Sequence, residues 1–172
     1  MRLLISAAGT GGHVFPALEF SEECIKNNHE VIWMGTKTGL ESRKVPEKNI
    51  QFLTIPMRGF RGKGLLNKCI SIFGLIASIG KTIIFLFQNK INFVVCFGGY
   101  ISLPVGIAAI LCRKQLILHE QNAVMGTSNK LLAAFAKIIF LGTPLAMVSQ
   151  KNTQLVGNPI KSINKHQDMA PP

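Results

Sequence analysis

Acidic residues are scarce in this chain, which has 19 lysines and arginines, 8 aspartates and glutamates, and a formal net charge of +11. From Lys48 to Gln167 the only acidic residue is Glu120, among fourteen lysines and arginines. Such a basic field favours an anionic partner: nucleic acid, an anionic membrane surface or a phosphorylated substrate. The sequence has neither a basic stripe with interleaved aromatic residues nor a recognisable nucleic-acid motif, so we expect no nucleic-acid partner.

Cysteine is also rare. The four cysteines lie apart in apolar segments, with no CxxC or Cys/His ligand spacing, and are Cys24, Cys69, Cys96 and Cys112. This pattern indicates reduced core residues and no metal site. The N-terminal apolar run Leu3-Leu4-Ile5 is too short for a signal peptide and is followed at once by glycines, so we expect a cytosolic setting.

Familiar nucleotide-binding motifs are missing from the glycine-rich segment Ala8-Gly9-Thr10-Gly11-Gly12-His13. A dinucleotide fingerprint beginning at Gly9 needs glycine or alanine where Val14 stands, and the segment does not end in the Gly-Lys-Ser/Thr of a P-loop. The segment instead predicts a turn between a strand and a helix, whose N–H groups approach an anion or a sugar oxygen. His13 would stand at its mouth as a general base, or else pack beside a turn that merely reverses the chain.

Short apolar segments alternate along the chain with longer helical ones. The expected strands are 2–6, 30–34, 52–55, 93–96, 115–118 and 138–141, and the expected helices are 16–28, 39–48, 66–89, 103–112 and 127–136. This alternation is typical of an α/β fold with a parallel sheet. Because ligands of such sheets bind beyond the carboxyl ends of the strands, function is expected in the loops that follow them.

Two of those loops carry polar or glycine-rich sequence. Gly98-Gly99-Tyr100 follows the strand at 93–96, and His119-Glu120-Gln121-Asn122 follows the strand at 115–118. Tyr100 either lines a site or caps the core. Glu120 is either an ion-pair partner or, as we favour, a functional carboxylate that orients a histidine, holds a sugar hydroxyl or acts as a base.

The apolar segment 69–87 has nearly the length of a membrane span. Lys81 and two glycines count against spanning, which would also place the neighbouring strands on opposite sides of the membrane. We interpret it as a long crossover helix whose surplus apolar face attaches to an anionic bilayer. The expected membrane contacts are Arg58, Arg61, Lys63, Lys68, Ile72, Phe73, Leu75 and Ile76. The alternative is a fully buried helix beside a solvated basic loop.

Six motifs occur in an order that resembles one family. They are Gly9-Thr10-Gly11-Gly12-His13 with Pro16-Ala17-Leu18, Gly35-Thr36 with Gly39-Leu40-Glu41, Arg58-Gly59-Phe60-Arg61-Gly62-Lys63-Gly64, Phe97-Gly98-Gly99-Tyr100, His119-Glu120-Gln121-Asn122-Ala123, and Val156-Gly157-Asn158-Pro159. From Arg2 to about Lys161 the chain resembles the N-terminal half of the MurG family, the bacterial N-acetylglucosaminyltransferases of glycosyltransferase family 28. Ala8 departs from the family, which usually has glycine there.

The resemblance implies one Rossmann-like half, residues 1–161, of a two-domain GT-B glycosyltransferase, with helices on both faces of the sheet and a linker or tail at 162–172. It implies inverting transfer of N-acetylglucosamine from UDP-N-acetylglucosamine to the C4 hydroxyl of the muramyl sugar of lipid I, which forms lipid II. Such a transfer needs in-line attack, a base for the hydroxyl and stabilisation of the departing diphosphate. No Asp-x-Asp metal signature occurs, so neither a metal nor a cofactor is expected.

The resemblance also assigns roles to residues. His13 or Glu120 would be the catalytic base. The expected substrate-binding residues are Gly9, Thr10, Gly11, Gly12, Gly98, Gly99, Tyr100, Gln121 and Asn122, and Thr10, Gly11, Gly12 and Asn122 would also face the donor. The basic loop and apolar helix would seat a peripheral protein on the cytoplasmic face of the membrane, at the anionic inner leaflet where lipid I resides.

The second Rossmann domain of the family, which supplies most of the site for UDP-N-acetylglucosamine, has no counterpart after Pro159. The chain would therefore bind that donor only together with a donor domain. It would be a truncated product, an excised domain, or the acceptor-binding subunit of a split transferase with a separate donor chain. The alternatives are a non-catalytic membrane-associated scaffold and a self-sufficient small nucleotide-binding enzyme.

Overall fold

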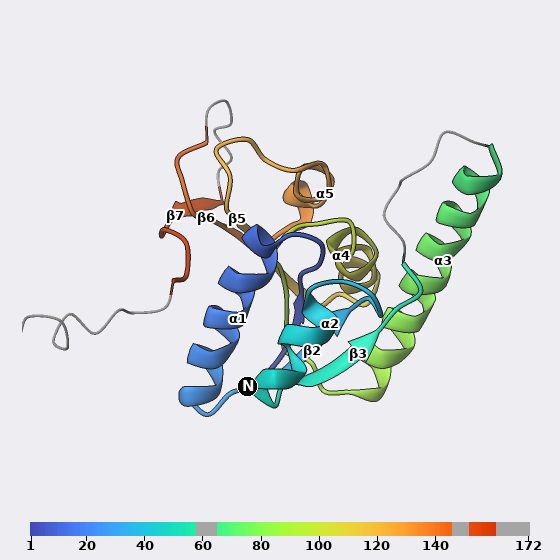
Figure 1. Ribbon diagram of the computed structural model, residues 1–172. Coiled ribbons are helices and arrows are strands. Elements are labelled where there is room, and N and C mark those ends of the chain that lie inside the picture. Colours follow the sequence, from blue (N-terminus) through green and yellow to red (C-terminus); the bar gives the residue numbers. More distant parts are fainter. Residues whose placement is uncertain (58–64, 146–151, 161–172) are drawn as a thin grey trace, which may run out of the picture.

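Seven parallel strands form one sheet in the order β3-β2-β1-β4-β5-β6-β7 (Figure 1). The strands are β1 (Arg2–Ser6), β2 (Glu30–Gly35), β3 (Gln51–Thr54), β4 (Phe93–Cys96), β5 (Gln115–Glu120), β6 (Ile138–Leu141) and β7 (Thr153–Leu155). The computed structural model describes residues 1–57, 65–145 and 152–160, without the side chains of 65–69. The first six strands confirm the segments predicted from the sequence; β7 was not predicted.

Helices cover both faces of this sheet. They are α1 (Gly11–Lys26), α2 (Glu41–Lys44), α3 (Leu65–Gln88), α4 (Ser102–Leu111) and α5 (Thr127–Leu132), with 3₁₀ turns at Pro46–Lys48 and Ala133–Phe135. One buried cluster joins α1 to the sheet through Val14, Leu18 and Trp33. A second cluster joins α3, α4 and α5 to the other face. The predicted α/β class with helices on both faces is therefore confirmed.

Two boundaries near the carboxyl edge of the sheet differ from the prediction. Helix α1 begins at Gly11, not at Pro16, because the Thr10 carbonyl already accepts the N–H groups of His13 and Val14, at 3.1 and 3.2 Å. Strand β5 includes His119 and Glu120, which pair with Phe140 and Leu141 of β6. These two residues were expected in a loop, but a neighbouring strand offers partners for their backbone groups.

Helix α3 crosses over from β3 to β4 and stands along one side of the sheet (Figure 1). Its inner face buries Ser78, Thr82 and Leu86. Its outer face exposes a stripe, which we call the apolar stripe, formed by Phe73 (74% exposed), Ile76, Ile84 and Phe87 (79% exposed). A fully buried helix, the alternative considered above, is therefore wrong.

By length and composition, Ile70–Gln88 is apolar enough to cross a membrane. It nevertheless connects two strands of one sheet and packs against α4. The segment Gly80-Lys81-Thr82 matches the last three positions of a P-loop, but it lies in the middle of this helix and follows no strand directly.

The expected membrane contacts divide into three groups. Ile72, Phe73 and Ile76 are exposed. Leu75 corrects the prediction, because it packs against the core cluster under α3. The remaining four lie outside the described side chains and are Arg58, Arg61, Lys63 and Lys68.

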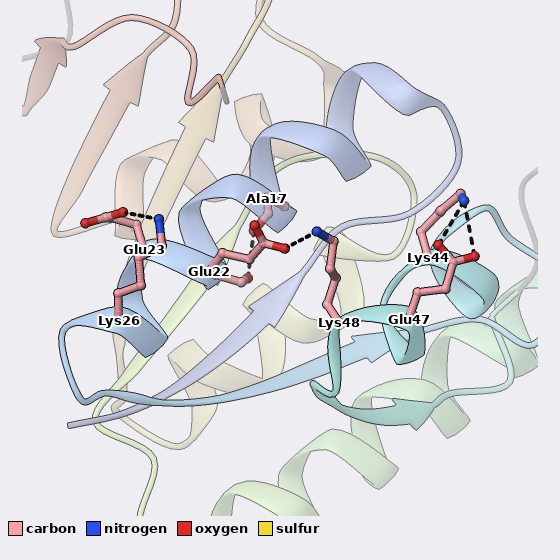
Figure 2. A network of polar contacts seen from close by, with 8 residues as sticks. Ala17, Glu22, Glu23, Lys26, Lys44, Glu47 and Lys48 are labelled. Carbon is pink, nitrogen blue, oxygen red and sulfur yellow. Dashed lines mark hydrogen bonds and ion pairs between the residues drawn. The ribbon is translucent and has the colours of Figure 1, made fainter. Parts of the chain in front are cut away.

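Exposed ion pairs lie on α1 and between α1 and the 3₁₀ turn at 46–48 (Figure 2). Lys48 pairs with Glu22 across the two elements, and Lys26 pairs with Glu23 within α1 at 3.2 Å. Pairs of this exposed kind contribute about 0.2–1 kcal/mol each. The buried clusters, and not these pairs, therefore hold α1 on the sheet.

Candidate functional site

A cavity of about 800 Å³ opens at the carboxyl ends of β1, β4 and β5. The glycine segment after β1, the turn after β4 and the segment around α5 form its walls. This is the edge at which parallel α/β sheets bind ligands. We call it the main cavity.

Close contact between two glycine turns shapes the floor of the main cavity. Gly99 has a φ of +77°, and a Cβ atom there would lie 2.4 Å from the carbonyl oxygen of Ala8. Gly98 has a φ of +92°, and a Cβ there would lie 2.8 Å from Cδ2 of His13. Glycine is required at both positions because L side chains avoid this backbone region and no space is left for one.

His13 lies in the first turn of α1 and lines the main cavity. Its Nδ1 is 3.1 Å from the hydroxyl of Thr10. Burial lowers the pKa of His13, and the negative charge of Glu120 opposes this shift only in part. His13 is therefore neutral at pH 7 and has one ring nitrogen free to accept a proton.

Glu120 also lines the main cavity, but its carboxylate is already saturated with N–H donors. Oε1 accepts the backbone and side-chain N–H groups of Asn122, at 3.1 and 3.0 Å. Oε2 accepts Gly126 N–H at 3.0 Å and Asn129 Nδ2 at 2.9 Å. Among the described residues it forms no ion pair, so the ion-pair interpretation fails, and the carboxylate instead orders the loop that leads into α5.

Asn129 and His119 are buried next to Glu120 and contact this loop and the strands beside it. Asn129 donates to the His119 carbonyl at 3.1 Å as well as to Glu120. The ring of His119 stacks on Phe97 with centroids 5.0 Å apart, and burial lowers its pKa. Asn129 was not singled out from the sequence, although the polar run Thr127-Ser128-Asn129 directly after Gly126 was a visible signal.

Glu41 is a second buried carboxylate that sequence reasoning did not single out as functional. It is fully buried, and Oε1 accepts the backbone N–H and hydroxyl of Thr36, at 3.1 and 2.7 Å. Oε2 accepts Gly9 N–H at 3.4 Å, which ties the glycine segment to the end of β2. The Thr36 hydroxyl is in turn 3.5 Å from the Tyr100 hydroxyl. Tyr100 both packs against the core and lines the main cavity, so the two interpretations considered for it each hold in part.

The main cavity brings together most of the predicted site residues. Those that line it are Gly9, Thr10, His13, Gly98, Gly99, Tyr100 and Glu120. Gly11, Gly12, Gln121 and Asn122 do not line it. Gln121 is buried, and its Nε2 donates to the Phe97 carbonyl at 2.9 Å, which joins the ends of β5 and β4. Roles in ligand binding remain predictions for all of these residues.

The described residues include neither a thiol with a lowered pKa nor a cluster of side chains that could bind a metal ion. Burial raises the pKa of Cys96 to about 12 and that of Cys24 to about 11, so both thiols are protonated at pH 7. No group of three or more His, Cys, Asp or Glu side chains that could hold a metal ion occurs among those residues.

The parallel sheet, its strand order and the cavity at its carboxyl edge define one Rossmann-like half of a GT-B glycosyltransferase. The crystal structure of Acinetobacter baumannii MurG matches with a TM-score of 0.81 and 33% identity, over 94% of this chain and 46% of that one. A glycotransferase of kitacinnamycin shares the fold at 10% identity, with a TM-score of 0.70 over 99% of this chain and 55% of that one. Residues 3–141 match the glycosyltransferase family 28 N-terminal domain, and the chain belongs to that family.

Two curated relatives carry the same descriptive name, UDP-N-acetylglucosamine–N-acetylmuramyl-(pentapeptide) pyrophosphoryl-undecaprenol N-acetylglucosamine transferase. The protein from Idiomarina loihiensis is 41% identical over 161 residues, which are 93% of this chain and 44% of the relative. The protein from Acidithiobacillus ferrooxidans is 43% identical over 159 residues, 92% of this chain and 44% of the relative. The chain thus spans less than half the length of the curated relatives it matches.

Proposed function

We propose that this chain is the acceptor-binding half of an inverting N-acetylglucosaminyltransferase that acts on lipid I. The names of relatives 41% and 43% identical to this chain supply the donor, UDP-N-acetylglucosamine, and the muramyl-pyrophosphoryl-undecaprenol acceptor. The match covers 44% of each of those relatives. Most of the donor site would therefore lie in the part of the relatives that this chain does not match. That part would be supplied in the same polypeptide or by a separate chain.

A neutral His13 at the main cavity carries this proposal. With Nδ1–H donating to the Thr10 hydroxyl, Nε2 accepts the proton of the acceptor C4 hydroxyl. The acceptor oxygen bonds to the anomeric carbon of N-acetylglucosamine, the bond from that carbon to the diphosphate breaks, and the electron pair leaves with UDP. Attack from the opposite side inverts the anomeric carbon.

Glu120 has a supporting role in this mechanism. Each of its oxygens already accepts two N–H groups, so neither is a ready acceptor for a substrate proton. Its charge also acts on the neighbouring imidazole, since it favours the protonated form of His13 that arises during the transfer. Of the two candidate bases, we therefore assign proton transfer to His13.

Transfer of radiolabelled N-acetylglucosamine to a lipid I analogue tests the assignment. The chain is produced with the C-terminal part of the Idiomarina loihiensis relative, both as a fusion and as two separate chains. The His13→Asn variant should lose about 10²- to 10⁴-fold in kcat, with KM for the acceptor changed by less than about threefold. The matched control is His29→Asn, a histidine substitution at the amino end of β2, far along the sheet from the main cavity.

Each outcome decides between functions. Activity of the combination with loss in His13→Asn supports the proposal. Full activity of His13→Asn assigns the base elsewhere. An inactive combination in which lipid I analogue still binds, with the same affinity for the His13→Asn variant, favours a non-catalytic scaffold. Activity of the chain without the added part would overturn the assignment of the donor site.

The proposal includes peripheral attachment to the cytoplasmic leaflet through the apolar stripe of α3. Phe73 and Phe87 are 74% and 79% exposed, and an aromatic ring moved from water into the bilayer interface gains about 1.5–3 kcal/mol. The double variant Phe73→Ser/Phe87→Ser should therefore lose about 3–6 kcal/mol and bind vesicles about 10²- to 10⁴-fold more weakly in cosedimentation. Leu111→Ser/Leu155→Ser removes two exposed apolar side chains outside α3 and should bind as the parent chain does.

A further inference from the structure

A second cavity, of about 470 Å³, lies where β2 and β3 end beside α3. We call it the lysine cavity. Its polar lining residues are two lysines, Lys37 and Lys81, and three threonines, Thr36, Thr38 and Thr54. Its lining includes no carboxylate. The mechanism proposed above uses none of these lysines.

The two lysines have no acidic partner in the described part of the chain, where neither takes part in an ion pair. Lys81 Nζ donates to the carbonyl of Thr54 at 2.6 Å, which fixes its ammonium group at the rim of the cavity. The ammonium groups of the two lysines and the hydroxyls of Thr38 and Thr54 are hydrogen-bond donors that suit a phosphate, whereas the Thr36 hydroxyl already donates to Glu41. The chemistry of the lining therefore favours a phosphate group or a similar anion.

The position of Lys81 on α3 indicates where that anion comes from. At roughly 100° per residue, Lys81 lies between the exposed Ile84 and the buried Ser78 and Thr82, at the border of the apolar stripe. A helix whose apolar face enters the interface by about 5–10 Å holds its flanking lysines at the level of the lipid headgroups. The lysine cavity lies on this flank, between α3 and β3.

We propose that the lysine cavity binds the headgroup phosphate of one anionic phospholipid while the apolar stripe rests on the bilayer. The inference rests on the membrane attachment included in the proposed function. It adds a discrete lipid site to a surface that would otherwise attract anionic lipid only through its overall charge. Bound in this way, the lipid fixes the rotation of α3 on the membrane, and hence the height of the main cavity above it.

Amide chemical shifts report on the site without a membrane. The probe is dihexanoylphosphatidylglycerol kept below its micelle-forming concentration, with dihexanoylphosphatidylcholine and glycerol phosphate as the other two arms. Phosphatidylglycerol should shift the amides of residues 36–38, 54, 55, 57 and 81 saturably. Phosphatidylcholine should do so much more weakly. Glycerol phosphate at the same concentrations tests whether a phosphate ester without acyl chains is enough, and a response equal to that of phosphatidylglycerol would overturn a lipid as the occupant.

Charge-matched variants complete the test on vesicles. Lys37→Gln/Lys81→Gln should abolish the shifts and weaken binding to phosphatidylglycerol vesicles about 20- to 30-fold, since each basic group near the surface contributes roughly a factor of five. The control Lys26→Gln/Lys114→Gln removes the same charge at the amino-end edge of the sheet, whereas the lysine cavity lies at the carboxyl ends of the strands. Because that edge lies beyond a screening length of about 8 Å, binding should change less than about twofold.

The outcomes separate this inference from the proposed function. Equal losses in the two lysine pairs would show diffuse attraction and overturn the discrete site, as would shifts that are absent or lie elsewhere. If Phe73→Ser/Phe87→Ser also binds vesicles as the parent chain does, the membrane attachment itself fails. Loss in Phe73→Ser/Phe87→Ser with no effect of Lys37→Gln/Lys81→Gln keeps the attachment and refutes the lysine cavity as its lipid site.

Discussion

Substituting Glu120 by glutamine tests whether this carboxylate organises the loop before α5 or performs chemistry. The glutamine side chain has the same shape but carries an NH₂ group in place of one oxygen. If the NH₂ group replaces Oε2, it faces the backbone N–H of Gly126, and if it replaces Oε1, it faces the backbone N–H of Asn122. The Asn122 side chain can turn its amide round, but a backbone N–H group cannot.

At least one backbone donor therefore loses its acceptor in either orientation. An N–H group left unpaired costs about 1–3 kcal/mol, towards the lower end here because both donors are only partly buried. The remaining bonds also lose their charge-assisted character, which adds about 1 kcal/mol. We expect the free energy of unfolding to fall by about 1–3 kcal/mol.

Urea unfolding followed by circular dichroism measures this change. The control is Glu23→Gln, whose ion pair with Lys26 is exposed and whose loss should change stability by less than about 0.5 kcal/mol. The decisive comparison adds the transfer assay. A Glu120→Gln variant as stable as the parent chain, but with activity as low as His13→Asn, would refute the structural role and restore Glu120 as the base.

Two further predictions concern the glycine turns and the histidines. Gly99→Ala should lower the free energy of unfolding by more than about 2 kcal/mol, because a φ of +77° costs about 1–2 kcal/mol and the added Cβ meets the Ala8 carbonyl. Gly80→Ala, in the open middle of α3, should instead raise it by about 0.5–1 kcal/mol, and equal effects in urea unfolding would contradict the argument. Burial lowers the pKa of both His13 and His119, so stability should be complete above the unfolded value of about 6.5 and fall as the pH drops through the lower folded values. Urea midpoints from pH 7.5 to 5 measure this fall, and an unchanged fall in His13→Asn/His119→Asn would show that other groups cause it.

The strand and helix pattern was largely readable from the sequence because it depends on local hydrophobicity. Segments such as 93–96 and 138–141 are short, apolar and separated by helical lengths, and they form β4 and β6 as predicted. Boundaries that depend on a distant partner were not readable. Strand β5 extends to Glu120 only because β6 lies beside it, and β7 is too short and polar to signal itself.

The candidate site was predicted in part for the same reason. Glycines after apolar strands marked the two turns that meet at Gly99, since positive φ and close backbone contact leave a local trace in sequence. Glu41 left no such trace, because its function in the fold is to bond Gly9, thirty-two positions away. Asn129 was missed likewise, since only packing brings it under the Glu120 carboxylate.

The sequence by itself determined the α/β class, the turns that line the main cavity and the family, because each depends on local patterns of apolar residues and glycine. Tertiary structure alone decided which partner each polar group has and which face each apolar group shows. It saturated Glu120 with N–H donors, kept His13 neutral by burial, and left Phe73 and Phe87 exposed while Leu75 packs inside. These outcomes depend on segments far apart in the chain, and only the closed sheet brings those segments together.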